Sequence, residues 1–161
     1  MSLTELVNTL WRQRESLELL LFKLEEEQLL LASGRGRWLG FATREVELVL
    51  DRIRQTEVLR AVHSDAVAGA LGLPPNSSLA VLADAAPEPW SGMLREHRTA
   101  FLVVTAEINA LAEANRELLT TGQRAVRETM LAVTGTLQMY GRHGAATDPY
   151  ATHARLVDEA M

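Results

Sequence analysis

Apolar residues recur along the first part of the chain at alternating spacings of three and four. This repeat places side chains on one side of an α-helix, so residues 3–31 are predicted to form one long helix. The strict heptad spacing favours coiled-coil-like packing against other helices. The expected contact positions are Leu3, Val7, Leu10, Arg14, Leu17, Leu21, Leu24, Gln28 and Leu31.

A second helix is predicted over about residues 38–70, after the reversal at SGRGR, residues 33–37. The two glycines of that stretch suit a tight turn, and a short link favours an antiparallel hairpin. The pattern slips near Thr56 and Glu57, which suggests a change of winding or of partner. The expected contact positions are Leu39, Ala42, Val46, Val49, Ile53, Leu59, Val62 and Ala66.

A third helix is predicted from Trp90 to about Thr134, because the heptad spacing there is uninterrupted. The proline-containing stretches LGLPPNSS (71–78) and APEPW (86–90) separate it from the second helix. Between them, Asn76 to Ser78 offer caps for a short helix over residues 78–86. The contact positions of the third helix are Leu94, His97, Phe101, Val104, Ile108, Leu111, Asn115, Leu118, Gly122 and Ala125.

These elements predict an all-α fold, an elongated antiparallel bundle of three long helices with one short connector helix. The expected domains are a helical bundle over residues 1–135 and a flexible tail over 136–161. The tail contains glycines and loses the periodicity, so at most one short helix, near 152–160, is expected in it.

The predicted helices differ in length, which bears on function. The first two hold about 30 residues and measure roughly 45 Å, whereas the third holds about 45 residues and measures roughly 67 Å. The third would therefore extend past the others by about four turns. Apolar surface without an internal partner marks an interaction site. The extension still carries the apolar residues Val126, Met130, Val133, Leu137, Met139 and Tyr140.

Two residues on the expected contact face of the third helix are unusual. Asn115 and Gly122 both lower helix or core stability unless they serve a specific contact. One interpretation places them at the mouth of a helix-binding site, where Asn restricts partners and Gly allows close approach. In the other, Asn115 pairs across the bundle with Gln28, Arg14 or Thr56, and Gly122 accommodates a bulky neighbour. The sequence leaves both open.

Composition and charge narrow the class of protein. The chain has 161 residues, no cysteine and a net charge of −5, with acidic and basic residues interspersed. No basic stripe indicates a nucleic-acid partner. Neither a signal peptide nor an apolar run of about 20 residues is visible, so we expect a cytoplasmic protein without membrane insertion.

Known catalytic and metal-binding motifs are absent from the sequence. The residues three before the four histidines are Arg60, Leu94, Tyr140 and Tyr150, so no Glu-x-x-His pair exists. HExxH, phosphate-binding and GxSxG motifs do not occur. REVELVLDRIRQ (44–55) is weakly similar to the first helix of helical chorismate mutases, but their site needs a lysine and the chain has only Lys23. We therefore expect no catalytic, metal or cofactor site, and a structural role for His97.

Several stretches together resemble one family. ANRELLTTG (114–122), preceded by EHRTAFLVVTAEINAL, is similar to the C-terminal helix of FlgN-type flagellar export chaperones. WRQRESLELLLFKLEEEQLLL (11–31) resembles their N-terminal helix, and LGLPPNSSLAVLADAAPEPW (71–90) resembles the connector of actinobacterial-type members. The resemblance covers roughly residues 3–134.

The resemblance implies a cytoplasmic chaperone that binds the C-terminal helical region of hook-associated proteins, which form the hook–filament junction, and keeps them unpolymerised before secretion. It also implies delivery to the flagellar type III export gate. In the family the C-terminal helix region carries the client contacts. If a client helix lies along this helix, Arg116 and Arg127 are expected at the rim of the contact. The candidate partner-binding residues are Asn115, Arg116, Leu118, Leu119, Gly122, Val126, Met130, Val133 and Leu137.

Periodicity alone also fits a second hypothesis. Sustained heptads are typical of coiled-coil scaffolds and oligomerisation modules that have no client. A scaffold would be a stable oligomer with no spare apolar surface. For the chaperone, we expect the unoccupied end of the third helix to be loosely ordered or covered by a second copy of the chain, as a homodimer.

Overall fold

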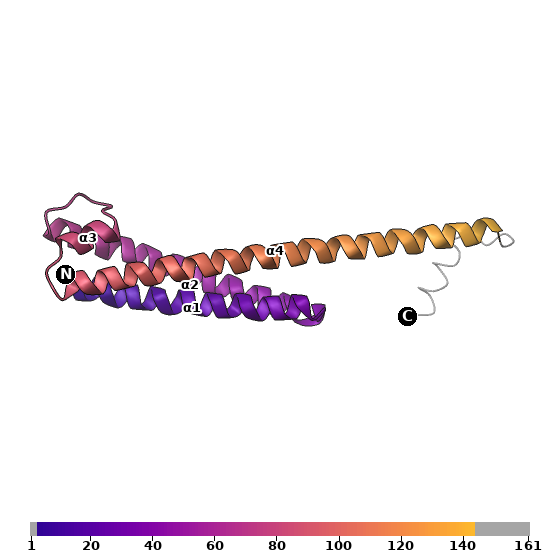
Figure 1. Ribbon diagram of the computed structural model, residues 1–161, viewed down its shortest axis with the longest axis horizontal. Coiled ribbons are helices and arrows are strands. Elements are labelled where there is room, and N and C mark those ends of the chain that lie inside the picture. The colour runs from indigo at the N-terminus through magenta and orange to yellow at the C-terminus, as the bar shows by residue number, and fades with distance from the viewer. Residues whose placement is uncertain (1–2, 144–161) are drawn as a thin grey trace. The chain divides into compact units, whose positions relative to one another are not determined.

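The computed structural model describes residues 3–143, and the prediction of an all-α helical bundle is confirmed within them. Its elements are α1 (Leu3–Ala32), α2 (Gly36–Ala70), α3 (Leu79–Ala85) and α4 (Trp90–His143) (Figure 1). The chain divides into two compact units, Met1–Glu117 and Leu118–Met161. The first unit therefore contains α1, α2, α3 and the first part of α4.

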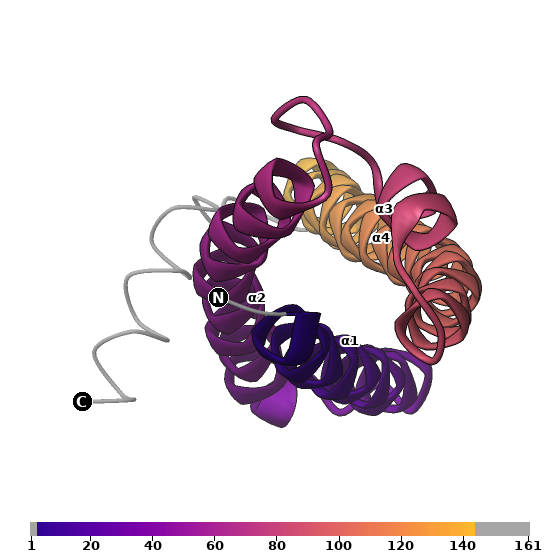
Figure 2. The same ribbon diagram turned by 90° about the vertical axis from the view of Figure 1, so that its left-hand side faces the viewer.

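In the first unit, α1 and α2 form a helical hairpin. Gly34 has a φ of 69°, in the left-handed region that glycine adopts without steric cost, and it reverses the chain. The amide of Arg35 donates to the carbonyl of Leu30 at 3.2 Å, which closes the end of α1. Viewed along the helices, α2 and the first part of α4 lie on different sides of α1 (Figure 2).

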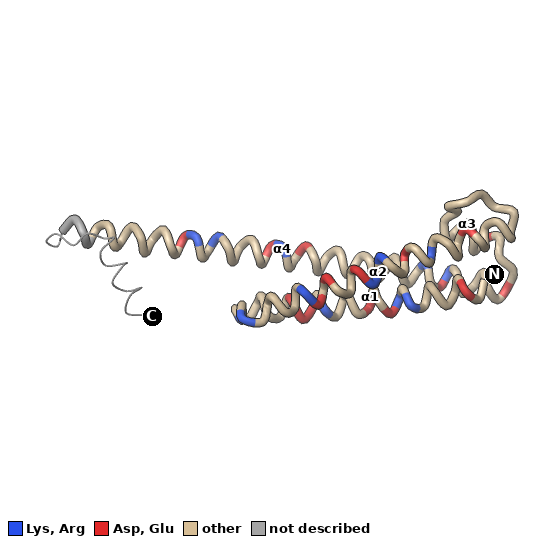
Figure 3. Tube along the Cα trace, turned by 180° about the vertical axis from the view of Figure 1, so that it is seen from behind, with Lys and Arg blue, Asp and Glu red and all other residues tan. Residues whose placement is uncertain are grey.

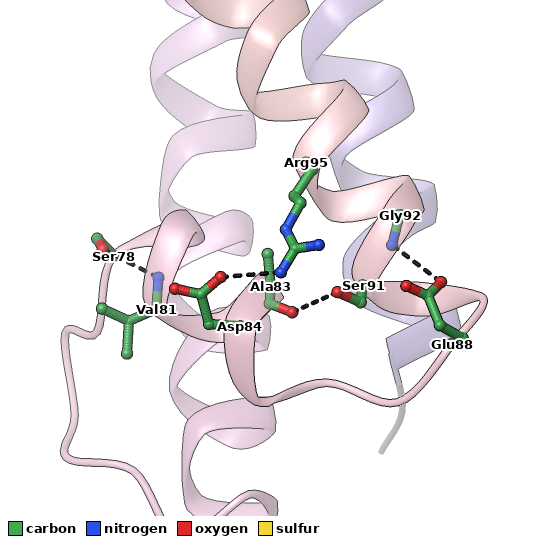
Figure 4. A network of polar contacts seen from close by, with 8 residues as sticks. All are labelled: Ser78, Val81, Ala83, Asp84, Glu88, Ser91, Gly92 and Arg95. Carbon is green, nitrogen blue, oxygen red and sulfur yellow. Dashed lines mark hydrogen bonds and ion pairs between the residues drawn. The ribbon is translucent and has the colours of Figure 1, made fainter.

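The short helix α3 ties the connector to the start of α4 (Figure 4). Ser78 caps it, because its Oγ accepts a hydrogen bond from the Val81 amide at 3.3 Å, as the sequence predicts. Ser91 Oγ donates to the Ala83 carbonyl at 2.7 Å, and Arg95 pairs with Asp84 at 3.0 Å. These two contacts join α3 to the first turns of α4.

The core of the first unit consists of two apolar clusters. One lies where α1 begins and α4 begins, and the other where α1 ends and α2 begins. The first contains Leu6, Val7, Leu10, Val67, Ala68, Leu82, Ala83, Ala86 and Leu94. The second contains Leu20, Leu24, Val46 and Val49, with Ile108 and Leu111 of α4 packed against it.

Buried polar residues lie between the two clusters along the α1–α2 contact. Gln13 Nε2 donates to Glu57 Oε1 at 2.7 Å, and Ser16 and Thr56 donate to backbone carbonyls of their own helices at 2.9 Å. Thr9 Oγ1 donates to the Glu5 carbonyl at 2.9 Å, so at 2.8 Å it accepts from Nδ1–H of His63. Gln13 Oε1 has no partner among the described residues, but the other groups are bonded, so the helices tolerate their burial.

The predicted contact face of α1 is confirmed, but it is too narrow. All nine predicted contact positions are buried or partly buried, yet Gln13, Leu20 and Glu27 are more buried than Arg14, Leu21 and Gln28, which follow them. Since α1 packs against both α2 and α4, it needs a wider buried face than one heptad stripe supplies. The intervening contact positions are Leu6, Gln13, Leu20 and Glu27.

The predicted slip in α2 does not occur. The alternating spacing continues from Ile53 through Thr56 to Val67, with the partly buried Arg60 and His63 between. Leu59 and Val62, which were expected to be contacts, are 48% and 55% exposed. Polar side chains occupy these contact positions because they find hydrogen-bond partners. Thr56 donates to the Arg52 carbonyl and Arg60 pairs with Glu57, both within α2, and His63 bonds to Thr9 of α1.

The third long helix extends beyond its predicted end. We expected it to stop near Thr134, but α4 continues to His143. A single glycine at position 135 costs a helix only about 1 kcal/mol, which the flanking helix formers tolerate. The rest of the predicted tail, residues 144–161, and the side chain of Tyr140 lie outside the described residues.

His97 is buried among aromatic side chains beside the first cluster. Its ring makes an edge contact with Trp11 at 4.7 Å and stacks on Phe101 at 6.0 Å. It is 2% exposed, and its Nδ1 has no hydrogen-bond partner among the described residues. Burial, and then the positive charge of Arg14, lower the pKa of His97, while Glu96 opposes them.

We expect the bundle to lose stability as the pH falls below about 6.5, the pKa of an unfolded histidine. In that range the unfolded chain takes up a proton that the buried His97 ring resists, so protonation favours unfolding. The stability that the neutral His97 ring contributes is fully present above pH of about 6.5. It declines as the pH falls towards the lowered pKa of His97 in the folded protein. Urea unfolding at several pH values should show a smaller acid loss in His97→Leu than in the parent. An unchanged profile would contradict this.

Candidate partner-binding surface

The second unit contains a helical surface that no described residue covers. Every residue of α4 from Thr120 to Met139 is exposed. Val126, Met130, Val133 and Leu137 follow one another at spacings of four, three and four, which places them on one face of the helix. Their exposed fractions are 65%, 62%, 51% and 56%, respectively. Contiguous apolar surface of this kind marks an interaction site.

Small residues flank this apolar stripe on one side. Gly122, Thr129 and Thr136 occupy positions beside it by helical periodicity. The hydroxyls of Thr129 and Thr136 each donate to a carbonyl of their own helix, at 2.9 Å. They therefore need no polar group from a partner, and a second helix can approach closely on this side. By the same periodicity, Gln123 and Arg127 flank the opposite side.

Asn115 lies inside the bundle rather than on this surface. It is 2% exposed, and its Nδ2 donates to the Leu24 carbonyl at 2.9 Å and to Glu27 Oε1 at 3.3 Å. Of the two interpretations of this residue, the structure supports pairing across the bundle. Its partners are not the three residues suggested from the sequence, because the α1 register places Glu27 rather than Gln28 at the contact.

The next candidate residues lie at the start of the exposed part of α4. Arg116 is exposed and pairs with Glu113 at 3.2 Å. Leu118 is 38% exposed, and Leu119 is partly buried. Leu119 lies seven residues before Val126 and so begins the same apolar stripe.

Gly122 has open space around it. A Cβ built at this position would meet no atom within 4 Å, so no bulky neighbour among residues 3–143 explains the glycine. The interpretations from the sequence that remain open are close approach of another molecule and bending of the helix.

We expect Gly122→Ala to stabilise this part of α4 by about 1 kcal/mol, because alanine is the better helix former and the site is unobstructed. Amide hydrogen exchange of residues around 122 should slow accordingly. If a partner helix approaches at Gly122, the same variant should bind its partner more weakly. Faster exchange in the isolated variant would contradict the prediction.

The sequence did not indicate a second feature, a hollow of about 660 Å³ along α2. It is lined by Gly36, Leu39, Gly40, Thr43, Arg44, Glu47, Leu48 and Asp51. In the sequence, the only signal for this hollow was the pair Gly36 and Gly40, which lie one helical turn apart and have no side chains. Across the described residues, no group of three or more His, Asp or Glu could hold a metal ion.

Comparison with known proteins gives the family. A family model described as FlgN protein matches residues 1–148. The chain belongs to the FlgN family. No curated protein and no solved structure matches the chain.

Membership of the FlgN family defines the general role. FlgN proteins are flagellar export chaperones and not enzymes. A chaperone acts through a surface that recognises a client, so the exposed stripe on α4 is the first candidate for that surface. None of the described helices of this FlgN protein is long and apolar enough to cross a membrane.

Proposed function

We propose that this FlgN protein is a cytoplasmic chaperone of hook-associated proteins and binds their C-terminal helical region along the exposed part of α4. The observation that carries the proposal is the apolar stripe formed by Val126, Met130, Val133 and Leu137, all at least half exposed. An export chaperone with a long uncovered apolar helix face needs a helical client to cover it.

The mode of recognition would be one amphipathic helix lying along another. The stripe supplies apolar contacts at the spacing that an α-helical partner can match. Methionine suits such a surface, because its flexible side chain adapts to different partners. Arg116 and Arg127 would set the orientation of the client more than its affinity.

Binding would keep the client unpolymerised by occupying the helical surface that it uses for assembly. An export gate is a second proposed partner, because a chaperone must release its cargo at the secretion apparatus. Before a client arrives, we expect a second copy of the chain to cover the stripe, which would give a homodimer in the unoccupied state.

The direct test is a titration of the full chain with a C-terminal helical fragment of a hook-associated protein from the same genome. Flagellin from that genome is the control ligand. We expect 1:1 binding with a Kd of about 1 μM or lower for the hook-associated fragment. A well-folded sample that binds neither fragment, and is a stable oligomer by light scattering, would instead support the coiled-coil scaffold.

A further inference from the structure

We infer that the tip of the α1–α2 hairpin binds the surface of an anionic phospholipid bilayer. The hairpin tip is defined here as residues 28–44, which include the end of α1, the reversal and the first turns of α2. This is adsorption to a membrane surface, which differs from insertion across it. The inference concerns a different part of the chain from the proposed client surface.

Charge distinguishes the tip from the rest of the protein. The whole chain has a net charge of −5, yet residues 28–44 contain three arginines and no Asp or Glu. Arg35, Arg37 and Arg44 are all exposed, and none forms an ion pair with a described residue. Figure 3 shows basic residues at the end of this hairpin.

Two of the acidic residues that flank the tip, Glu27 and Glu45, are held in contacts with other side chains. Glu27 is buried, accepting a hydrogen bond from Thr43 at 3.3 Å and another from Asn115 at 3.3 Å. Glu45 forms an ion pair with Lys23 at 2.9 Å, and this contact lowers the pKa of Glu45. Lys23 therefore balances the charge of Glu45, and the buried Glu27 presents no carboxylate at the surface of the tip, whereas Glu25 and Glu47 remain exposed on the turns that flank it.

The tip also exposes apolar and aromatic side chains beside these arginines. Trp38 is 46% exposed and Phe41 is 67% exposed, with their ring centroids 5.8 Å apart. The guanidinium of Arg37 lies 4.9 Å from the Trp38 ring centroid. On α1, the other helix of the hairpin, Leu29 is 71% exposed.

This combination matches the interface of a bilayer better than an acidic protein surface. Trp and Phe gain by entering the headgroup region, while arginine interacts with anionic headgroups around them. A sharp turn lets a flat surface contact the tip while most acidic residues of the helices remain farther away, where salt screens them. An acidic protein would not by itself account for the exposed aromatic pair.

The test is co-sedimentation of the full chain with vesicles of equal parts phosphatidylglycerol and phosphatidylcholine, compared with phosphatidylcholine alone. We expect binding to the anionic vesicles only, weakened by salt. The double variant Arg35→Gln/Arg37→Gln should bind about 25-fold more weakly, since each arginine contributes about fivefold. Trp38→Ser/Phe41→Ser should lose binding and retain the parent melting temperature, because both rings are exposed.

Phe22 provides a matched control. It is 56% exposed and has Lys23 Nζ 5.4 Å from its ring, but acidic residues surround it in the sequence. Phe22→Ser should bind anionic vesicles as the parent does. The inference is overturned if the parent does not bind anionic vesicles, if the tip variants bind normally, or if Phe22→Ser is equally defective. Client titration of the tip variants should remain unchanged, which separates this result from the proposed function.

Discussion

Replacing Asn115 by Asp should lower the free energy of unfolding by about 3–5 kcal/mol. The substitution removes the two hydrogen bonds that Nδ2 donates to α1 and places a second carboxylate beside Glu27, whose Oε1 is 3.3 Å from that nitrogen. Both residues are less than a tenth exposed, so water screens the repulsion poorly. Urea unfolding of the purified variant measures the loss.

Two comparisons show whether the loss arises from this contact. Adding Glu27→Gln to the variant should recover much of the stability, because an amide again faces a carboxylate at this contact. Lower pH should also restore stability, because the two carboxylates at positions 27 and 115 can then share a proton. Asn109→Asp makes the same change at an exposed position of α4 and should alter stability by less than about 0.5 kcal/mol. Equal effects at 109 and 115 would show that Asn115 is not a core contact.

Met130→Asp should weaken binding of the hook-associated fragment at least 30-fold, about 2 kcal/mol, while the melting temperature stays within a few degrees of the parent. Met130 is 62% exposed and lies in the middle of the apolar stripe. A charge there must be desolvated when a client helix covers it, but remains in water in the unoccupied protein. Calorimetric titration and thermal unfolding give the two quantities.

Leu102→Asp is the matched control for this prediction. Leu102 belongs to the same helix and is 57% exposed, but it lies in the first unit, away from the stripe. Both substitutions have the same small cost in helix propensity. The proposed surface is contradicted if the two variants bind equally well, and a large stability loss in Met130→Asp alone would show that Met130 is a core residue.

Much of the helical organisation could be predicted because its causes are local. The hydrophobic repeat, the glycine at position 34, the prolines after residue 73 and the Ser78 cap act within a few residues of themselves. The apolar character of residues 126–137 could be predicted from the sequence in the same way. Its exposure could be suggested only by comparing helix lengths, because exposure depends on what else packs nearby.

The buried polar contacts could not be predicted in the same way. Gln13 meets Glu57 and Asn115 meets Leu24 and Glu27, residues that are 44, 91 and 88 positions apart in the sequence. Periodicity identifies apolar faces, so a polar residue at a contact position looks like an interruption of the pattern. The apparent slip of the heptad pattern at Thr56 was such an error, because hydrogen bonding allows polar residues to occupy contact positions.

The sequence by itself determined the order of the helices of this FlgN protein, the breaks between them, the distribution of charge and the family, because these follow from local propensity and residue order. Only the tertiary structure decided the register of α1 and the burial of Asn115 and His97. It also decided which apolar residues are exposed, among them Trp38, Phe41 and Met130. The reason is physical: a side chain is buried or exposed according to neighbours that are distant in sequence, and the same heptad repeat allows more than one set of neighbours.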